Sequence, residues 1–169
     1  MINTKYLKHS ATLALCFFVA LASCRQNPTN STSSIAETTG TSIADTIIYP
    51  VLIKNANPND SWTEHCLSRL EREKFTDQLF EAVYSEKATA YSYNTHEPLT
   101  LTEVRNIEQQ AEFTRDKVAK LQFWETWRFD EQSLRMTKKV HAILLAYEIF
   151  TEEGELRGYK AAFYVKLPH

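Results

Sequence analysis

Glycine is scarce in this chain of 169 residues, which contains only Gly40, Gly154 and Gly158. Neither a G-x-G-x-x-G nor a G-x-x-x-x-G-K-[ST] segment can be written from these positions, and such loops bring backbone N–H groups against phosphates. The common nucleotide-binding designs are therefore excluded. We predict no nucleotide ligand and no cofactor.

A surplus of positive charge is also lacking. The chain has 19 basic and 21 acidic residues, so its formal net charge is −2. Domains that bind nucleic acid usually present a strong basic field to the phosphate backbone. The charge balance therefore predicts no nucleic-acid partner.

Catalytic and metal-binding motifs are missing too. The sequence contains no H-x-x-x-H, C-x-x-C or G-x-S-x-G segment, the signatures of zinc sites and serine hydrolases. His141 is a candidate general base, but we favour a hydrogen-bonded structural histidine. Four carboxylates are candidates for a glycosidase pair: Glu125, Asp130, Glu148 and Glu152. We interpret them instead as solvated charges at strand edges. We predict a non-enzymatic protein with no catalytic residue and no metal ligand.

The N-terminal apolar run is too short to span a membrane. Residues 11–22 are uncharged and as a helix would rise about 18 Å, against a hydrocarbon core of about 30 Å. Because Lys5 and Lys8 precede the run, it indicates a secretion signal.

The run ends in Leu21-Ala22-Ser23-Cys24. Small residues before a cysteine at this point resemble the lipobox of bacterial lipoproteins. The resemblance implies a signal peptide at residues 1–23, cleavage before Cys24, and diacylglycerol on its sulfur. Two or three acyl chains give a stable membrane anchor. We therefore expect lipid anchoring to a bacterial membrane, with the periplasmic side of the outer membrane favoured.

Cleavage removes Cys16 and the lipid occupies the sulfur of Cys24, so the single remaining free cysteine is Cys66. No intramolecular disulfide can form, and we interpret Cys66 as a small buried core residue rather than a nucleophile or an intermolecular bridge. Residues 24–46 are predicted to be a lipidated flexible tether, because a segment rich in Gln, Asn, Ser and Thr buries too little apolar surface to fold. The folded domain is assigned to residues 47–169.

The first half of this domain combines one strand-like segment with helical patterns. Residues 47–53 are apolar and contain Pro50, which suits an edge strand. The S-x-x-E capping box that begins at Ser61 predicts a helix to about Ser85, with a break near Lys74. Two further segments are a strand-like stretch at 88–93 and a helix from the capping box of Thr100 and Glu103 to about Glu112.

The last third is typical of antiparallel strands. Residues 123–129 alternate with a period of two and carry aromatic side chains on both faces. Residues 140–150 are compatible with a strand or a buried helix, and we favour a strand because turn residues follow at 152–155. Residues 159–167 close a hairpin. The predicted fold is α+β, with N-terminal helices packed on a C-terminal antiparallel β-meander.

Aromatic residues mark the candidate binding site. If one face of the strand at 123–129 is core, the other face carries Trp124. That side chain is either covered by another part of the domain or anchors a partner. The candidate partner-binding residues are Trp124, Trp127, Arg128 and Phe129.

Two motifs are shared with a known family. One is the segment 79–91, a helical pattern that runs into Thr89-Ala90-Tyr91; the other is 124–140, which begins Trp-Glu-Thr-Trp-Arg-Phe-Asp. Over residues 75–169 the chain resembles the GldN/PorN family, periplasmic components of the gliding-motility and type IX secretion machinery of Bacteroidetes. The resemblance implies assembly rather than catalysis. The lipobox indicates a divergent, lipidated relative.

We therefore expect a non-enzymatic, lipid-anchored cell-envelope protein that binds other envelope proteins, in a gliding-motility or type IX secretion assembly. A second hypothesis is a lipoprotein that binds a small ligand or a glycan through Tyr and Trp side chains. A third is an enzyme with an unrecognised site, which clustered and shifted carboxylate or histidine pKa values would indicate.

Overall fold

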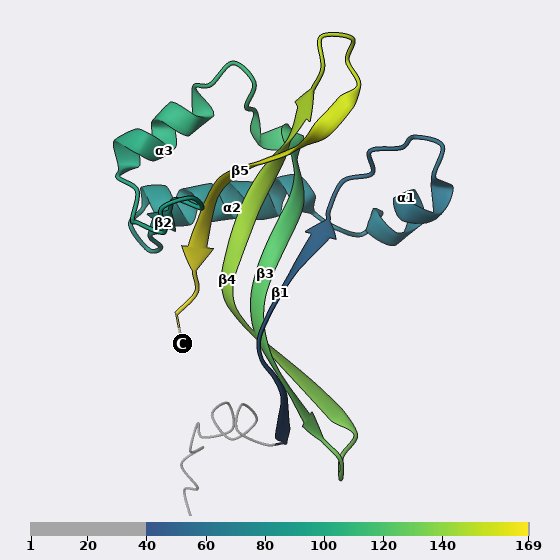
Figure 1. The fold of residues 1–169 in the computed structure, drawn as a ribbon. Helices are drawn as coiled ribbons and strands as arrows, with labels where there is room; N and C mark the ends of the chain where they lie inside the picture. Colours follow the sequence, from purple (N-terminus) through teal and green to yellow (C-terminus); the bar gives the residue numbers. More distant parts are fainter. Residues whose placement is uncertain (1–39, 169) are drawn as a thin grey trace, which may run out of the picture. The chain divides into compact units, whose positions relative to one another are not determined.

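Five antiparallel strands form one sheet in the order β1-β3-β4-β5-β2 (Figure 1). The computed structural model describes residues 40–168, which belong to a single unit. In chain order, the elements are β1 (Thr41–Leu52), α1 (Ser61–Leu67), α2 (Arg72–Tyr84), β2 (Ala90–Tyr91), α3 (Leu101–Glu108), the 3₁₀ turn η1 (Arg115–Lys117), β3 (Val118–Asp130), β4 (Arg135–Phe150) and β5 (Leu156–Lys166).

The α+β class is confirmed, but the helices are not N-terminal to the whole sheet. β1 comes first and pairs antiparallel with β3 at the edge of the sheet, so the helices lie between the first and third strands. The expected edge strand at 47–53 is present and begins earlier, at Thr41. Pairing with β3 supplies backbone hydrogen bonds to a polar segment that has no apolar pattern of its own.

The predicted tether therefore needs correction at its C-terminal end, because residues 41–46 are part of β1. Gly40 precedes this strand with a φ of 94°. A Cβ at this position would lie 2.7 Å from the carbonyl carbon of Phe129, so the close approach of the two backbones requires glycine. The remainder of the predicted tether, the signal peptide and Cys24 lie outside the described residues.

The predicted meander is confirmed, since β3, β4 and β5 are consecutive antiparallel neighbours. The β3–β4 turn is organised by Asp130, whose carboxylate accepts hydrogen bonds from the backbone of Gln132 at 2.9 Å and the hydroxyl of Ser133 at 2.8 Å. Bonds from Ser133 and Gln132 lower the pKa of Asp130. Asp130 thus stabilises a turn, as its place between two strands suggests.

Side-chain caps begin two of the helices, α1 and α3. The capping box of Thr100 and Glu103 is present at the start of α3, which ends at Glu108, four residues before the predicted end. For α1, the N-cap is Asp60 rather than Ser61: its carboxylate accepts the N–H of Thr63 at 3.0 Å. The helical region breaks between α1 and α2, close to the predicted break.

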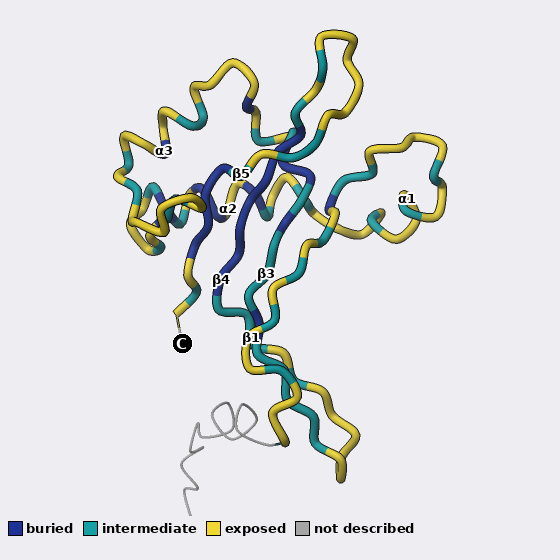
Figure 2. The backbone as a smooth tube through the Cα atoms, in the orientation of Figure 1, coloured by how far each residue is buried: buried dark blue, intermediate teal, exposed yellow. Residues whose placement is uncertain are grey.

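The hydrophobic core lies between α2 and one face of the sheet. Phe80 and Phe163 are both fully buried, and their rings meet edge to face with centroids 4.9 Å apart. Figure 2 shows the buried residues concentrated on α2, at the start of β3, in the second half of β4 and near the end of β5. The stripe that α2 buries consists of Thr76, Leu79, Phe80 and Val83.

Cys66 is exposed, which corrects its prediction as a core residue. It lies on α1, whose seven residues include none that are buried. This helix is set to the side of the sheet (Figure 1), so its apolar positions have no core to enter. None of the helices within residues 40–168 is long and apolar enough to cross a membrane.

Candidate functional site

The two faces of the sheet differ in what covers them. We call the face that carries Phe163 and packs against α2 the covered face, and the opposite one the open face. The open face has its own smaller apolar cluster, to which only strand residues contribute: Tyr91, Trp124, Ala142, Leu144, Ala161 and Tyr164.

The four predicted partner-binding residues do not form one surface. Side chains alternate between the faces along β3, so Trp124 and Arg128 lie on the open face, while Trp127 and Phe129 lie on the other. Trp127 donates from Nε1 to the Glu125 carboxylate at 2.6 Å. Only Trp124 belongs to the open-face aromatic cluster.

Three aromatic rings from three strands lie one beside the next on the open face. The ring of Tyr164 stacks on Tyr91, with centroids 5.2 Å apart and planes at 20°, and contacts Trp124 at 5.5 Å and 34°. We call Tyr91, Trp124 and Tyr164 the aromatic stack. Ala142 of β4 pairs with Trp124, and its small side chain lets the two larger rings meet above β4.

A β-bulge places His141 beside this stack. In the pairing of β3 with β4, Trp124 lies opposite Ala142 and Glu125 opposite Val140, which leaves His141 as the extra residue. Its Nε2 forms a hydrogen bond with the hydroxyl of Thr126. The expectation of a hydrogen-bonded histidine is confirmed.

Two cavities open on this side of the sheet. The first has a volume of about 280 Å³ and is lined by Thr46, His96, Trp124, His141, Ala142, Tyr164 and Lys166. The second has a volume of about 450 Å³ and is lined by Thr126, Arg128, Thr137, Lys138, Lys139, Val140, Leu167 and Pro168.

The linings of the two cavities contain four Lys or Arg residues and two histidines but no Asp or Glu. The Thr126–His141 hydrogen bond joins residues of the two linings. Lys166 also places its Nζ 4.2 Å from the centroid of the Tyr91 ring. This surface thus combines aromatic rings with positive charge and suits a partner that carries negative charge.

Two of the four candidate carboxylates are buried, which corrects their interpretation as solvated edge charges. Glu125 is 4% exposed and Glu148 is 3% exposed. Glu125 shares the covered face with Phe123, whereas Glu148 points to the opposite side from Tyr147, a covered-face residue. The two carboxylates therefore do not face each other as a glycosidase pair would.

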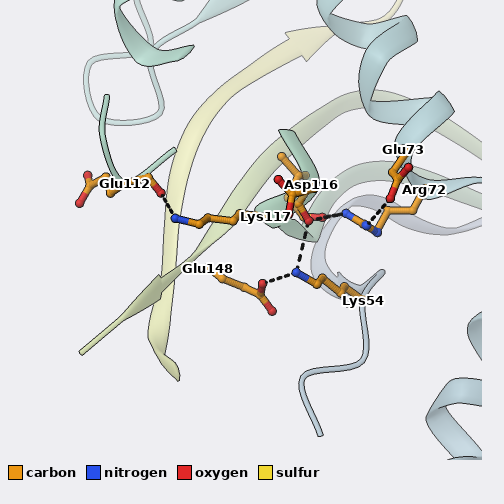
Figure 3. Close-up of polar contacts among 8 residues, drawn as sticks. Lys54, Arg72, Glu73, Glu112, Asp116, Lys117 and Glu148 are labelled. Carbon is orange, nitrogen blue, oxygen red and sulfur yellow. Dashed lines mark hydrogen bonds and ion pairs between the residues drawn. The ribbon is translucent and has the colours of Figure 1, made fainter. Parts of the chain in front are cut away.

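Each buried carboxylate is bound by neighbouring side chains. Glu125 accepts hydrogen bonds from Trp127 and, at 3.0 Å, from the hydroxyl of Tyr49. Burial raises the pKa of Tyr49, and the hydrogen bond to the Glu125 carboxylate raises it further. Glu148 forms an ion pair with Lys54 at 2.6 Å (Figure 3).

The Glu148 ion pair belongs to a polar junction between the sheet and the helices. Lys54 also donates to the carbonyl of Asp116 in η1 at 3.3 Å, and Arg72 at the start of α2 donates to the same carbonyl at 2.6 Å (Figure 3). Because these bonds join the segment that follows β1 to α2, η1 and β4, the junction fixes the arrangement of these elements. Glu152 remains an exposed residue in the β4–β5 turn.

Within the described residues, no group of three His, Cys, Asp or Glu side chains is arranged to hold a metal ion. No protein-family model matches the chain. A search of curated proteins finds no match either.

The sequence did not single out most residues of the open face. Tyr91 lay in a segment predicted as strand-like and Tyr164 in a predicted hairpin strand, but neither was proposed for binding. Their contact depends on the pairing of β2 with β5, which no local pattern reveals. The available signal was alternation: Phe163 and Tyr164 are adjacent, so one of them had to leave the core.

Proposed function

We propose that this protein is a non-enzymatic, lipid-anchored component of the cell envelope that binds another envelope protein through the open face of its sheet. The observation that carries the proposal is the aromatic stack of Tyr91, Trp124 and Tyr164 beside two cavities lined by cationic residues. Aromatic anchors supply a large share of the energy of protein interfaces.

The roles of the buried carboxylates support a binding function over catalysis. Glu125 is held by two hydrogen-bond donors and Glu148 by an ion pair, so both contribute to the fold. The lipobox at Cys24 supports a membrane anchor, and the lack of an acidic run after Cys24 favours the periplasmic side of the outer membrane. The GldN/PorN-like motifs support a place in a gliding-motility or type IX secretion assembly, as a divergent relative.

The test compares two tryptophan variants in native envelopes. Trp124→Ala removes the end of the aromatic stack, whereas Trp62→Ala removes a tryptophan that is 72% exposed on α1, away from the open face. After mild crosslinking and affinity recovery, mass spectrometry measures the copurified proteins. We expect Trp124→Ala to lower the recovery of specific partners about tenfold, equivalent to about 1.4 kcal/mol of binding energy, and Trp62→Ala to leave it unchanged.

Retention of the same partners by Trp124→Ala would contradict the proposal, and so would an equal loss in both variants. Thermal unfolding of each variant serves as the control for folding, since a lost partner is informative only if the domain remains folded. Both variants remove the same side chain, so the comparison isolates its position on the open face.

A second candidate function is the binding of a small anionic ligand or glycan in the cavity of about 280 Å³. The presence of Lys166 and two histidines in its lining favours this alternative, although ligand pockets commonly measure 300–1,000 Å³. Native mass spectrometry of protein recovered from cells tests it. A bound small molecule that Trp124→Ala releases would favour this function over partner-protein binding.

A further inference from the structure

One stretch of β4 has an uncovered backbone edge. β5 pairs with β4 from Ala142 to Phe150, whereas β4 itself begins at Arg135. In the part of the chain that the structure describes, residues 135–140 thus have β3 on one side and no strand on the other. Figure 1 shows the β3–β4 ribbon continuing past the end of β5. We call residues 135–140 the free edge.

Among the described residues, the strand that pairs with this side of β4 ends where β5 ends. The last backbone hydrogen bond along this line runs from the N–H of Leu167 to the carbonyl of His141 at 2.8 Å. Pro168 follows and has no N–H to continue the ladder. Beyond this point lies the cavity of about 450 Å³, bounded by residues 137–140, Leu167 and Pro168. A strand entering here would continue the line of β5 along about 20 Å of β4.

The other edges of the sheet are less suited to accept a strand. β1 carries Pro50, and its pairing with β3 has two register irregularities, between Ser42 and Ala44 and between Ala44 and Ile47. Prolines and bulges are devices that prevent edge pairing. At the opposite side, β2 pairs with only Tyr164 and Val165 of β5, and the rest of β5 contains Gly158 and two register irregularities in its pairing with β4. The free edge of β4 contains neither proline nor glycine, and the bulge of this strand lies beyond it, at His141.

Charge indicates what kind of strand the free edge would accept. Its six residues include Arg135, Lys138 and Lys139 and no acidic residue. Lys138 lies over the Trp127 ring at 4.2 Å, on the side of the covered face, and Lys139 lines the cavity on the open side. A second copy of this edge would bring like charges together, whereas an acidic strand would meet cations on both sides.

We propose that the free edge of β4 is a docking site for an acidic, extended segment of a partner protein, which joins the sheet as a strand in line with β5. Backbone hydrogen bonds supply the affinity, and the flanking lysines select negative charge. This inference rests on the proposed function, because it names the kind of segment through which an envelope partner binds.

The test uses a labelled ten-residue peptide in which Glu-Glu and Val-Val pairs alternate, so that both faces of the added strand carry Glu. The peptide is mixed with the full chain, and fluorescence anisotropy measures the dissociation constant. Three further probes accompany it: the same peptide with N-methyl groups on alternate backbone nitrogens, a Lys-Val peptide, and oligogalacturonate. We expect the Glu-Val peptide to bind, N-methylation to weaken binding at least tenfold because it removes backbone donors, and the Lys-Val peptide to show no binding.

The protein variants separate edge charge from total charge. The double variant Lys138→Glu, Lys139→Glu is expected to weaken peptide binding at least tenfold. The matched control Lys74→Glu, Lys87→Glu changes the charge equally at exposed positions away from the free edge and is expected to leave binding within twofold. Hydrogen–deuterium exchange of the unaltered protein gives an independent readout: the peptide should slow exchange within residues 135–140.

Equal affinity for the N-methylated peptide would overturn strand addition. Tighter binding of oligogalacturonate would assign the site to an acidic glycan instead, and absence of peptide binding at millimolar concentration would reject the site. Each of these results leaves the Trp124 experiment on envelope partners unaffected, so failure of this inference is distinguishable from failure of the proposed function.

Discussion

Phe123 and Trp124 are neighbours in β3, yet they belong to different surfaces. Phe123 packs against the covered-face core, together with Phe80 of α2 and Phe163 of β5. Trp124 contacts Tyr164 on the open face, beside two cavities. Aromatic side chains of one strand therefore belong to the helix-covered core on one face and to a cluster of strand residues on the other.

This difference is set by alternation together with what lies above each face. α2 buries a stripe of side chains against the covered face, whereas the open-face cluster is formed by strand residues alone. Trp124 is only partly buried, although its open-face neighbours Ala142, Leu144 and Tyr164 are buried, so its removal leaves a smaller cavity than the removal of a fully buried ring. The two faces should therefore respond differently to the same kind of substitution.

The largest expected effect is on the covered face. Phe163→Ala removes a fully buried ring that contacts Phe80 at 4.9 Å and should lower the free energy of unfolding by about 3–5 kcal/mol. Trp124→Ala should lower it by about 1 kcal/mol, the range of substitutions outside a packed core. Urea unfolding followed by circular dichroism measures both. Equal losses would show that the open face is as much a core as the covered one.

A smaller effect is expected from the ion pair of Lys54 with Glu148. Lys54→Met leaves the Glu148 carboxylate, which is 3% exposed, without its cation. Breaking a fully buried ion pair costs about 3–5 kcal/mol of stability. Because the Lys54 side chain is partly exposed, we expect a smaller loss of about 2 kcal/mol. Lys74→Met, which breaks the exposed pair with Glu71, is the matched control and should cost less than about 0.5 kcal/mol.

The double variant Lys54→Met, Glu148→Leu sharpens this test. It removes the carboxylate along with the lysine, and we expect it to recover most of the stability lost by Lys54→Met alone. Unfolding in urea is again the measurement. If the double variant is less stable than Lys54→Met, Glu148 contributes through other contacts and not through an uncompensated charge.

Local patterns predicted much of this fold. The alternation in residues 123–129 gave β3 its two faces, and the capping box of Thr100 gave the start of α3. These features depend on neighbours within a few positions, as side-chain alternation and helix capping do. The functional expectations that rest on Cys24 and on the GldN/PorN-like motifs remain predictions.

Features that depend on distant contacts could not be predicted in this way. β1 begins at Thr41 because β3 lies beside it, and Glu148 is buried because Lys54, which is 94 positions away, reaches it. The aromatic stack likewise joins β2, β3 and β5. Cys66 shows the reverse case, since an apolar side chain on α1 stays exposed where no other element covers the helix.

The smallest expected effect concerns Glu125, the buried carboxylate of the covered face. Trp127→Phe keeps an aromatic ring but removes the Nε1–H that donates to Glu125, and Tyr49→Phe removes the other hydrogen bond. Each change should lower the free energy of unfolding by about 1 kcal/mol, the typical net value of one hydrogen bond. Trp62→Phe, at an exposed position, is the control and should have no measurable effect.

The combination of Trp127→Phe with Tyr49→Phe distinguishes Glu125 from Glu148. In each single variant the Glu125 carboxylate keeps one hydrogen-bond donor. The double variant removes both donors from this carboxylate, whose residue is only 4% exposed. Its cost should therefore exceed the sum of the single costs, as expected for residues of one hydrogen-bond network. Additive costs in a double-mutant cycle would mean that water replaces the lost donors, and that this end of the covered face is as accessible as the open face.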